Sequence, residues 1–209
     1  MGGHAAGEIA SRITAEKVEE ILSQGGPEPN TEELLQLAVQ AANASVHETQ
    51  KLQAECRGMG STLTVLTFSG EGDRYYVAQV GDSRAYLLRG GILTQLTQDH
   101  SLVWPLYTSG IISKDDISRN PRKNLITRSI GTQPSVDADL HAGEALEGDL
   151  FLLCSDGLTD VLSDEDISRV LSNGRRNPGH MAQLLVAAAN EGGGPDNITA
   201  VVIYLAPER

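Results

Sequence analysis

The chain has 209 residues, enough for one sizeable domain, and its 40% hydrophobic content excludes wholesale disorder. Sixteen Lys and Arg against 28 Asp and Glu give a net charge of −12. Such an acidic surface repels phosphate backbones and anionic lipid heads, so neither nucleic acid nor a membrane is expected as a partner. Two cysteines without a CxxC pair exclude a disulfide framework, and together with a start that lacks a basic, apolar leader they predict a cytoplasmic protein.

Two helices are predicted near the start, after a loop over residues 1–4. Apolar residues recur on one face of residues 5–24, and the Gly-Gly-Pro sequence at 25–27 is expected to end that helix. Thr31 is a suitable N-cap for a second helix, whose apolar stripe extends to about residue 55. This region therefore predicts a pair of amphipathic helices.

The sequence then changes to the alternation of polar and apolar residues that half-buried strands show. Four short strands with tight turns between them are predicted, at residues 62–68, 74–80, 83–88 and 92–96. Gly81 and Asp82, between the second and third of these strands, are expected to form an ordinary hairpin turn. Together the four strands predict an antiparallel meander.

Residues from about 100 to 125 are less regular and are the best candidate for a mobile surface segment. Further elements are expected along the rest of the chain: helices at 100–109, 115–118, 164–171 and 181–189, and strands at 125–130, 136–140, 150–154 and 198–205. Helix pairs beside a meander predict an α+β protein, with helices packed on antiparallel sheet.

Two aspartates stand where apolar strands begin or end. Asp156 follows the strand at 150–154 and precedes a glycine, while Asp196 follows a run of glycines and precedes the last strand. A carboxylate beside buried surface needs a cation or hydrogen-bond donors, and Mg²⁺ and Mn²⁺ prefer such oxygen ligands. On spacing alone, the alternative that both acids only cap turns is the commoner one. Asp99 similarly fits the N-terminus of a helix, where capping is its ordinary role.

Six short motifs follow one another along almost the whole chain. They are Met1-Gly2-Gly3-His4, Gly58-Met59-Gly60-Ser61-Thr62, Val80-Gly81-Asp82-Ser83-Arg84, Gln98-Asp99-His100-Ser101, Ser155-Asp156-Gly157-Leu158 and Pro195-Asp196-Asn197-Ile198-Thr199. Each motif alone is weak, but their order closely resembles that of the metal-dependent serine/threonine protein phosphatases of type 2C (PPM). The compact length is similar to that of the bacterial branch.

The resemblance implies a fold and an activity. The family fold is a four-layer α-β-β-α sandwich of two antiparallel sheets flanked by helix pairs, which here implies one phosphatase domain over residues 1–209 with a flap at about 100–125. Family members hydrolyse phosphoserine and phosphothreonine in proteins with a water that two Mn²⁺ or Mg²⁺ ions activate. The expected partners are therefore phosphorylated proteins, the substrates of serine/threonine kinases.

The resemblance also implies metal ligands at particular positions. Asp156 and Asp196 match two ligand aspartates of the family, and Asn197 would support Asp196. Asp99 matches the aspartate that, with the Asp156 position, holds a third and weaker ion in bacterial members. Residues 82–84 match a motif that is mostly structural in the family.

The chain departs from the family pattern at its start. The family reads Asp-Gly-Met-Gly-Gly-His where this chain begins at Met1, so the bridging aspartate and the glycine whose carbonyl is a ligand are absent. The preceding strands, with their phosphate-binding arginine, are absent as well, and an N-terminally truncated domain is therefore expected. Three explanations are open: a misassigned start, a fragment, and a truncated pseudophosphatase that acts as a partner-binding regulatory module.

Overall fold

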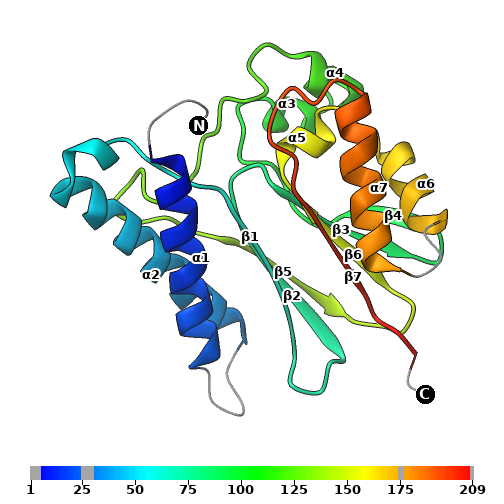
Figure 1. The fold of residues 1–209 in the computed structure, drawn as a ribbon, viewed down its shortest axis with the longest axis horizontal. Helices are drawn as coiled ribbons and strands as arrows, with labels where there is room; N and C mark the ends of the chain where they lie inside the picture. The colour runs from blue at the N-terminus through cyan, green and yellow to red at the C-terminus, as the bar shows by residue number, and fades with distance from the viewer. Residues whose placement is uncertain (1–5, 25–30, 174–176, 208–209) are drawn as a thin grey trace.

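The computed structural model describes residues 6–24, 31–173 and 177–207. Two antiparallel sheets lie face to face, and a pair of helices covers the outer face of each sheet (Figure 1). This arrangement confirms the expected α-β-β-α sandwich. The loop predicted at 1–4 and the helix stop predicted at 25–27 lie outside the described residues.

One outer layer consists of α1 (Gly7–Ser23) and α2 (Thr31–Leu52), which pack against each other on the left of Figure 1. Small and branched side chains recur at spacings of three and four, so the helices approach each other and the sheet closely. The buried residues of this layer include Ala10, Val18, Leu35, Ala38, Val39, Ala42 and Val46. A short 3-10 turn, η1 (Ala54–Cys56), follows α2.

The inner layers, within the described residues, are a three-stranded and a four-stranded sheet. The first has the order β1-β2-β5, with β1 at Leu63–Phe68, β2 at Arg74–Val80 and β5 at Asp139–Glu144. The second has the order β4-β3-β6-β7, with β3 at Arg84–Arg89, β4 at Ile92–Gln95, β6 at Leu150–Cys154 and β7 at Ala200–Tyr204. The strand pairs are antiparallel.

Aromatic side chains fill the space between the two sheets. Phe151 of β6 is 1% exposed and meets Phe68 and Tyr75 of the other sheet edge to face, at ring-centroid distances of 5.6 and 5.0 Å. Truncation of such a buried phenylalanine typically costs about 3–5 kcal/mol. This aromatic contact therefore contributes strongly to holding the sheets together.

The meander predicted over residues 62–96 is wrong. β2 pairs with β1 and β5, whereas β3 pairs with β4 and β6, so the chain passes from one sheet to the other at residues 81–83. Both strands are buried along most of their length, so their backbone groups need partners on both edges. Gly81 makes the crossing possible: its φ is +110°, and a Cβ there would lie 2.5 Å from the Thr62 methyl group.

The flap contains two short helices, α3 (Trp104–Thr108) and α4 (Lys114–Arg119), where one helix at 100–109 and another at 115–118 were expected. The first helix is shorter than predicted because tertiary contacts hold the residues before it. The N–H of His100 donates to the Gly81 carbonyl at 2.9 Å, and the Trp104 N–H donates to Ser101 Oγ at 3.3 Å.

Two strand predictions after the flap are corrected. In the described chain, residues 125–130 form only isolated bridges, and the strand predicted at 136–140 begins at Asp139 instead. The intervening loop bonds to a helix rather than to a neighbouring strand. Asn43 of α2 accepts from the Gly131 N–H at 2.7 Å and donates to the Gln133 carbonyl at 3.1 Å.

The last part of the chain supplies the other outer layer. After the one-turn helix α5 (Asp156–Thr159), the helices predicted at 164–171 and 181–189 are confirmed as α6 (Asp164–Asn173) and α7 (Pro178–Glu191). Helix α7 packs on β7 at the edge of the second sheet. Among the described residues, no helix is both long and apolar enough to cross a membrane.

Candidate metal centre

Ser155 joins the end of β6 to the segment that precedes β7. Its hydroxyl donates to the Asn197 carbonyl at 3.1 Å and accepts from the Thr199 N–H at 3.0 Å, while its own N–H donates to the Thr199 carbonyl at 3.1 Å. These three bonds fix the two segments against each other. They bring Asp156 and Asp196, 40 positions apart in the sequence, into the same corner of the molecule.

Gly157 makes the same approach possible from the other side. A Cβ at this position would lie 2.4 Å from the Asn197 carbonyl oxygen, which is closer than any side chain can approach. The glycine after Asp156 is therefore required by a backbone contact, and not by an unusual φ.

Asp156 is the first residue of α5, and its Oδ1 accepts from the Gly157 N–H at 2.9 Å. Its pKa is raised, first by burial and then by the negative charges of Asp160 and Asp196. Asp196 is exposed and accepts from the N–H of Asn197 at 2.7 Å and from its side-chain amide at 3.5 Å. These two contacts orient the carboxylate of Asp196.

Asp82 belongs to the same group of acids, although sequence reasoning treated it as a turn residue. It lies on the crossing between β2 and β3, is 7% exposed, and makes no ion pair with any described residue. Burial, followed by the charges of Asp156 and Asp99, raises its pKa to about 6. The available signal was its position directly after a buried strand, as for Asp156.

Two buried side chains hold the turn that carries Asp82. His100 accepts from the Gly81 N–H through Nδ1 at 3.0 Å, so its proton lies on Nε2, which is 3.1 Å from Asp139 Oδ2. Burial lowers the pKa of His100. Gln79, 1% exposed, donates to the Gly81 carbonyl at 2.9 Å, and both contacts fix the crossing beside the acids.

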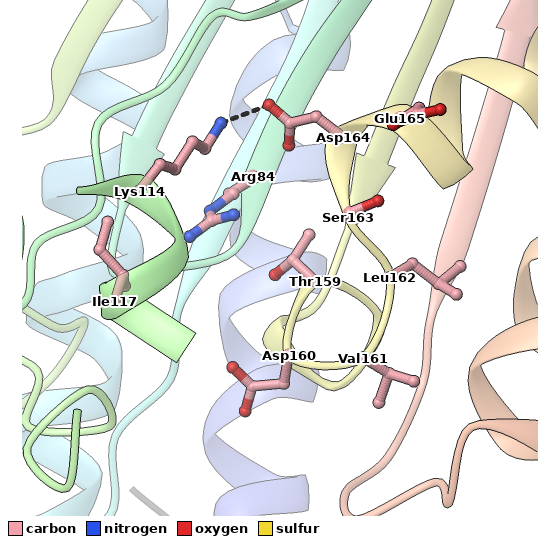
Figure 2. A pocket seen from close by; sticks show the side chains of 10 residues that line it. All are labelled: Arg84, Lys114, Ile117, Thr159, Asp160, Val161, Leu162, Ser163, Asp164 and Glu165. Atoms are coloured by element: carbon pink, nitrogen blue, oxygen red, sulfur yellow. Dashed lines mark hydrogen bonds and ion pairs between the residues drawn. The ribbon is translucent and has the colours of Figure 1, made fainter. Parts of the chain in front are cut away.

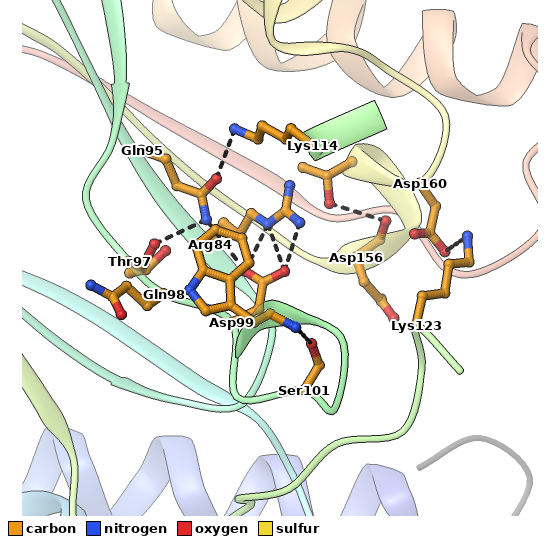
Figure 3. A network of polar contacts seen from close by, with 12 residues as sticks. Arg84, Gln95, Thr97, Gln98, Asp99, Ser101, Lys114, Lys123, Asp156 and Asp160 are labelled. Atoms are coloured by element: carbon orange, nitrogen blue, oxygen red, sulfur yellow. Dashed lines mark hydrogen bonds and ion pairs between the residues drawn. The ribbon is translucent and has the colours of Figure 1, made fainter. Parts of the chain in front are cut away.

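Asp99 is placed differently from the other acids. It caps no helix in the described chain; instead it forms a buried ion pair with Arg84, whose Nε and Nη2 donate to its two oxygens at 2.8 and 2.6 Å (Figure 3). The capping role is therefore wrong, because the first flap helix begins at Trp104. Asp99 already has a cationic partner, whereas Asp82 and Asp156 form no ion pair within the described residues.

The chemistry of these donors fits a hard divalent cation. Carboxylate oxygens are the preferred ligands of Mg²⁺ and Mn²⁺. Burial first, and then repulsion between carboxylates, raises the pKa of Asp82 and Asp156, and a positive ion would relieve the repulsion. Within the described ranges, however, no three His, Cys, Asp or Glu side chains converge on one metal position. Asp156, Asp196 and Asp99 thus supply donors, but not a closed ligand set.

A pocket of about 450 Å³ lies between the flap helix α4 and the segment that joins α5 to α6 (Figure 2). Lys114, which lines the pocket, pairs with Asp164 at 2.5 Å, and Lys123, which does not line it, pairs with Asp160 at 2.8 Å; both ion pairs fasten the flap. Arg84 also points into this pocket, so the cation that holds Asp99 is reached from the flap side.

Comparison with known proteins gives one consistent result. Residues 1–190 match the family "Protein phosphatase 2C". The chain is 40% identical to the serine/threonine protein phosphatase PstP of Mycobacterium tuberculosis over 204 residues, which cover 97% of this chain and 38% of that protein. It is 34% identical to the serine/threonine phosphatase stp of Listeria monocytogenes, over 97% of this chain and 81% of that protein.

A solved structure agrees with this result. The catalytic domain of PstP, in complex with two manganese ions, superposes with a TM-score of 0.88 at 37% identity, over 99% of this chain and 85% of that one. The fold, the order of the motifs and the sequence identity all point to one family. The chain belongs to the protein phosphatase 2C family of metal-dependent serine/threonine phosphatases.

Proposed function

We propose that this chain is the catalytic part of a protein phosphatase that hydrolyses phosphoserine and phosphothreonine. The observation that carries the proposal is the contact between the Ser155 and Asn197 segments, which places Asp156 beside Asp196. A solved catalytic domain of the same family, 37% identical to this chain, is in complex with two manganese ions.

In this proposal Asp156 and Asp196 contribute ligands to two Mn²⁺ or Mg²⁺ ions, and Asp99 with Asp156 contributes to a third. Bound divalent cations supply a nucleophilic water at neutral pH and compensate the charge of the phosphoryl oxygens. They would also let a protein of net charge −12 accept a dianionic ester, because the ions reverse the local sign of the potential. In this proposal Asn197 orients Asp196, and Gly157 permits the close approach of the two segments that carry the ligands.

The proposed substrates are phosphorylated proteins in the cytoplasm, made by serine/threonine kinases. The flap is the part of the described chain best placed to contact them, because it borders the acids and is fastened through the half-buried side chains of Lys114 and Lys123. No nucleic acid or membrane is required by this reaction.

A second candidate is a catalytically impaired module of the same fold that binds partners. The observation in its favour is that the described donors do not converge as a closed set on one metal position. Such a module would bind Mn²⁺ weakly and would bind phosphoproteins without turning them over.

One set of assays separates the two candidates. The chain is incubated with a phosphothreonine peptide in Mn²⁺, and Mn²⁺ binding is measured in parallel by calorimetry. Hydrolysis that is lost in Asp156→Asn and kept in the surface variant Glu16→Lys supports the phosphatase. Peptide binding without phosphate release, equal in all three proteins, supports the binding module and overturns the proposal.

A further inference from the structure

Arg84 and Asp99 form the most completely bonded ion pair near the candidate ligands. Three hydrogen bonds of 2.6 to 3.1 Å join the guanidinium to both carboxylate oxygens, and the side chains are only 11% and 6% exposed. Removing one partner of such a pair leaves an uncompensated buried charge. Asp99 can therefore accept another cation only if Arg84 moves away or that cation takes over its role.

The other side of Arg84 contacts the flap. Its guanidinium carbon lies 5.8 Å from the centre of the Trp104 ring in α3, a cation–π distance. Trp104 is 8% exposed, and its indole N–H is buried without an acceptor among the described residues. The observed position of the flap thus leaves one polar group unsatisfied beside Arg84.

A second connection reaches the flap through Gln95. The Gln95 amide donates to Asp99 Oδ1 at 3.3 Å, and its carbonyl accepts from Lys114 Nζ at 3.1 Å (Figure 3). Lys114 also donates to Asp164 at 2.5 Å. The Gln95 amide also donates to the Thr97 carbonyl at 2.9 Å, so Lys114 and Thr97 together orient Gln95 with its amide N–H group toward Asp99.

The connections close into a ring. Arg84 donates to the Tyr86 hydroxyl at 3.1 Å, and that hydroxyl contacts Asp164 at 3.5 Å, where Lys114 is bound. Asp99 is therefore held by two donors, Arg84 and Gln95, and both are linked to flap residues. If a different cation binds the Asp99 carboxylate, these contacts must change.

We propose that Arg84 is a positioning residue that occupies Asp99 in place of a divalent cation, and that a cation binding at Asp99 displaces Arg84 and repositions the flap. This inference rests on the proposed function, because it takes Asp99 as a metal ligand. Competition with an internal cation accounts for a weak site, since the incoming ion gains only the difference between the two interactions. It also makes the flap respond to the metal.

The sole tryptophan of the sequence, Trp104, provides the first test. Mg²⁺ is titrated into the protein while the emission of Trp104 is recorded, and total binding is followed by calorimetry. The emission is expected to change with the weaker binding phase in the wild type. In Asp99→Asn the change is expected to disappear, while the stronger binding phase remains.

Lys114 provides the second test, with Lys123 as a matched control. Lys114→Met removes the donor to the Gln95 carbonyl and leaves only the Thr97 carbonyl to orient the amide, so its bond to Asp99 is weakened. The Mg²⁺ midpoint of the Trp104 signal is then expected to fall, by at most about three- to tenfold, as for the loss of one net hydrogen bond to a charged group. Lys123→Met removes the other flap ion pair, to Asp160, without touching the ring. Lys123→Met is therefore expected to leave the Mg²⁺ midpoint of the Trp104 signal close to the wild-type value, whereas Lys114→Met lowers it.

The outcomes distinguish this inference from the proposed function. A Mg²⁺-dependent emission change that remains in Asp99→Asn, or equal midpoint shifts from the two lysine variants, overturns the role of Arg84 even if Mn²⁺ binds at Asp156 and hydrolysis is observed. Absence of all metal binding by the wild type overturns the proposed function and this inference together.

Discussion

Asp156 and Asp99 both lie close enough to Asp82 to raise its pKa, but their charges are balanced in different ways. Asp156 forms no ion pair within the described residues, and its own pKa is raised, first by burial and then by the neighbouring acids. Asp99 is neutralised by Arg84, whose pKa is raised in turn because the pair stabilises the charged guanidinium. The comparison teaches that a carboxylate which matches a metal motif is not automatically free to bind a metal.

The largest expected effect comes from breaking the ion pair between Arg84 and Asp99. Arg84→Met leaves Asp99 buried and uncompensated, so we expect the free energy of unfolding to fall by about 3–5 kcal/mol, measured by urea denaturation without metal. The double variant Arg84→Met/Asp99→Leu should recover much of this loss. If the single variant is as stable as the wild type, the pair does not hold this part of the fold.

The next largest effect is expected beside Asp156, which has no ion pair within the described residues. Gly157→Ala places a Cβ against the Asn197 carbonyl, so we expect a loss of about 1–3 kcal/mol in stability and a weaker affinity for Mn²⁺. Gly179→Ala is the matched control, because its Cβ would meet only an ordinary contact at 3.6 Å. Thermal denaturation and calorimetry measure both variants, and equal behaviour of the two contradicts the close approach.

The pH dependence of stability tests the burial of Asp82. Its pKa is about 6 in the folded protein against 3.8 for the free side chain, so the folded state holds more protons between these values. Stability should therefore fall as the pH rises from about 4 to about 6, and it should be flat above. Asp82→Asn should be more stable than the wild type at pH 7, by on the order of 1–3 kcal/mol.

The exposed residue Asp137 offers a control for this experiment. Asp137→Asn removes an equal charge at the surface and should leave both the stability at pH 7 and the slope between pH 4 and 6 nearly unchanged. A wild-type slope that survives in Asp82→Asn would assign the titration to another acid.

The smallest effect is expected from surface substitutions in α1, outside the candidate site of Asp156 and Asp99. Glu16→Lys and Glu19→Lys change exposed positions of α1 and should alter the free energy of unfolding by no more than about 0.5 kcal/mol. Salt screens their influence on Mn²⁺ binding at Asp156, so the calorimetric midpoint should hardly move. A shift as large as that of Asp156→Asn would mean that the site is misplaced.

Much of the architecture could be predicted from periodicity, because it depends on local patterns. Periodicity predicts α1 and α2 from their apolar stripes, and it predicts β6 from its continuous apolar run. The pairing of β2 and β3 could not be predicted in this way, because their partners β5 and β6 lie about 60 residues further along the chain. Turn chemistry at Gly81 fits a hairpin and a crossing equally well.

The candidate site, like the fold, could be predicted only in part. The motifs identify Asp156, Asp196 and Asp99 as family positions, and the structure brings the first two together. That Arg84 occupies Asp99 depends on a side-chain contact across 15 positions and on burial, which motifs do not encode. The involvement of Asp82 depends on the crossing itself, so the error in strand pairing also hid a site residue.

The crossing at residues 81–83 also bears on how the chain folds. Each half of it can form a local hairpin, β1 with β2 and β3 with β4, but β5 begins only at Asp139 and β7 only at Ala200. Among the described residues the first sheet is complete only at Glu144 and the second only at Tyr204, so loop closure over long separations must precede most of the stabilisation. The two sheets are therefore expected to form late and together, as a single cooperative unit.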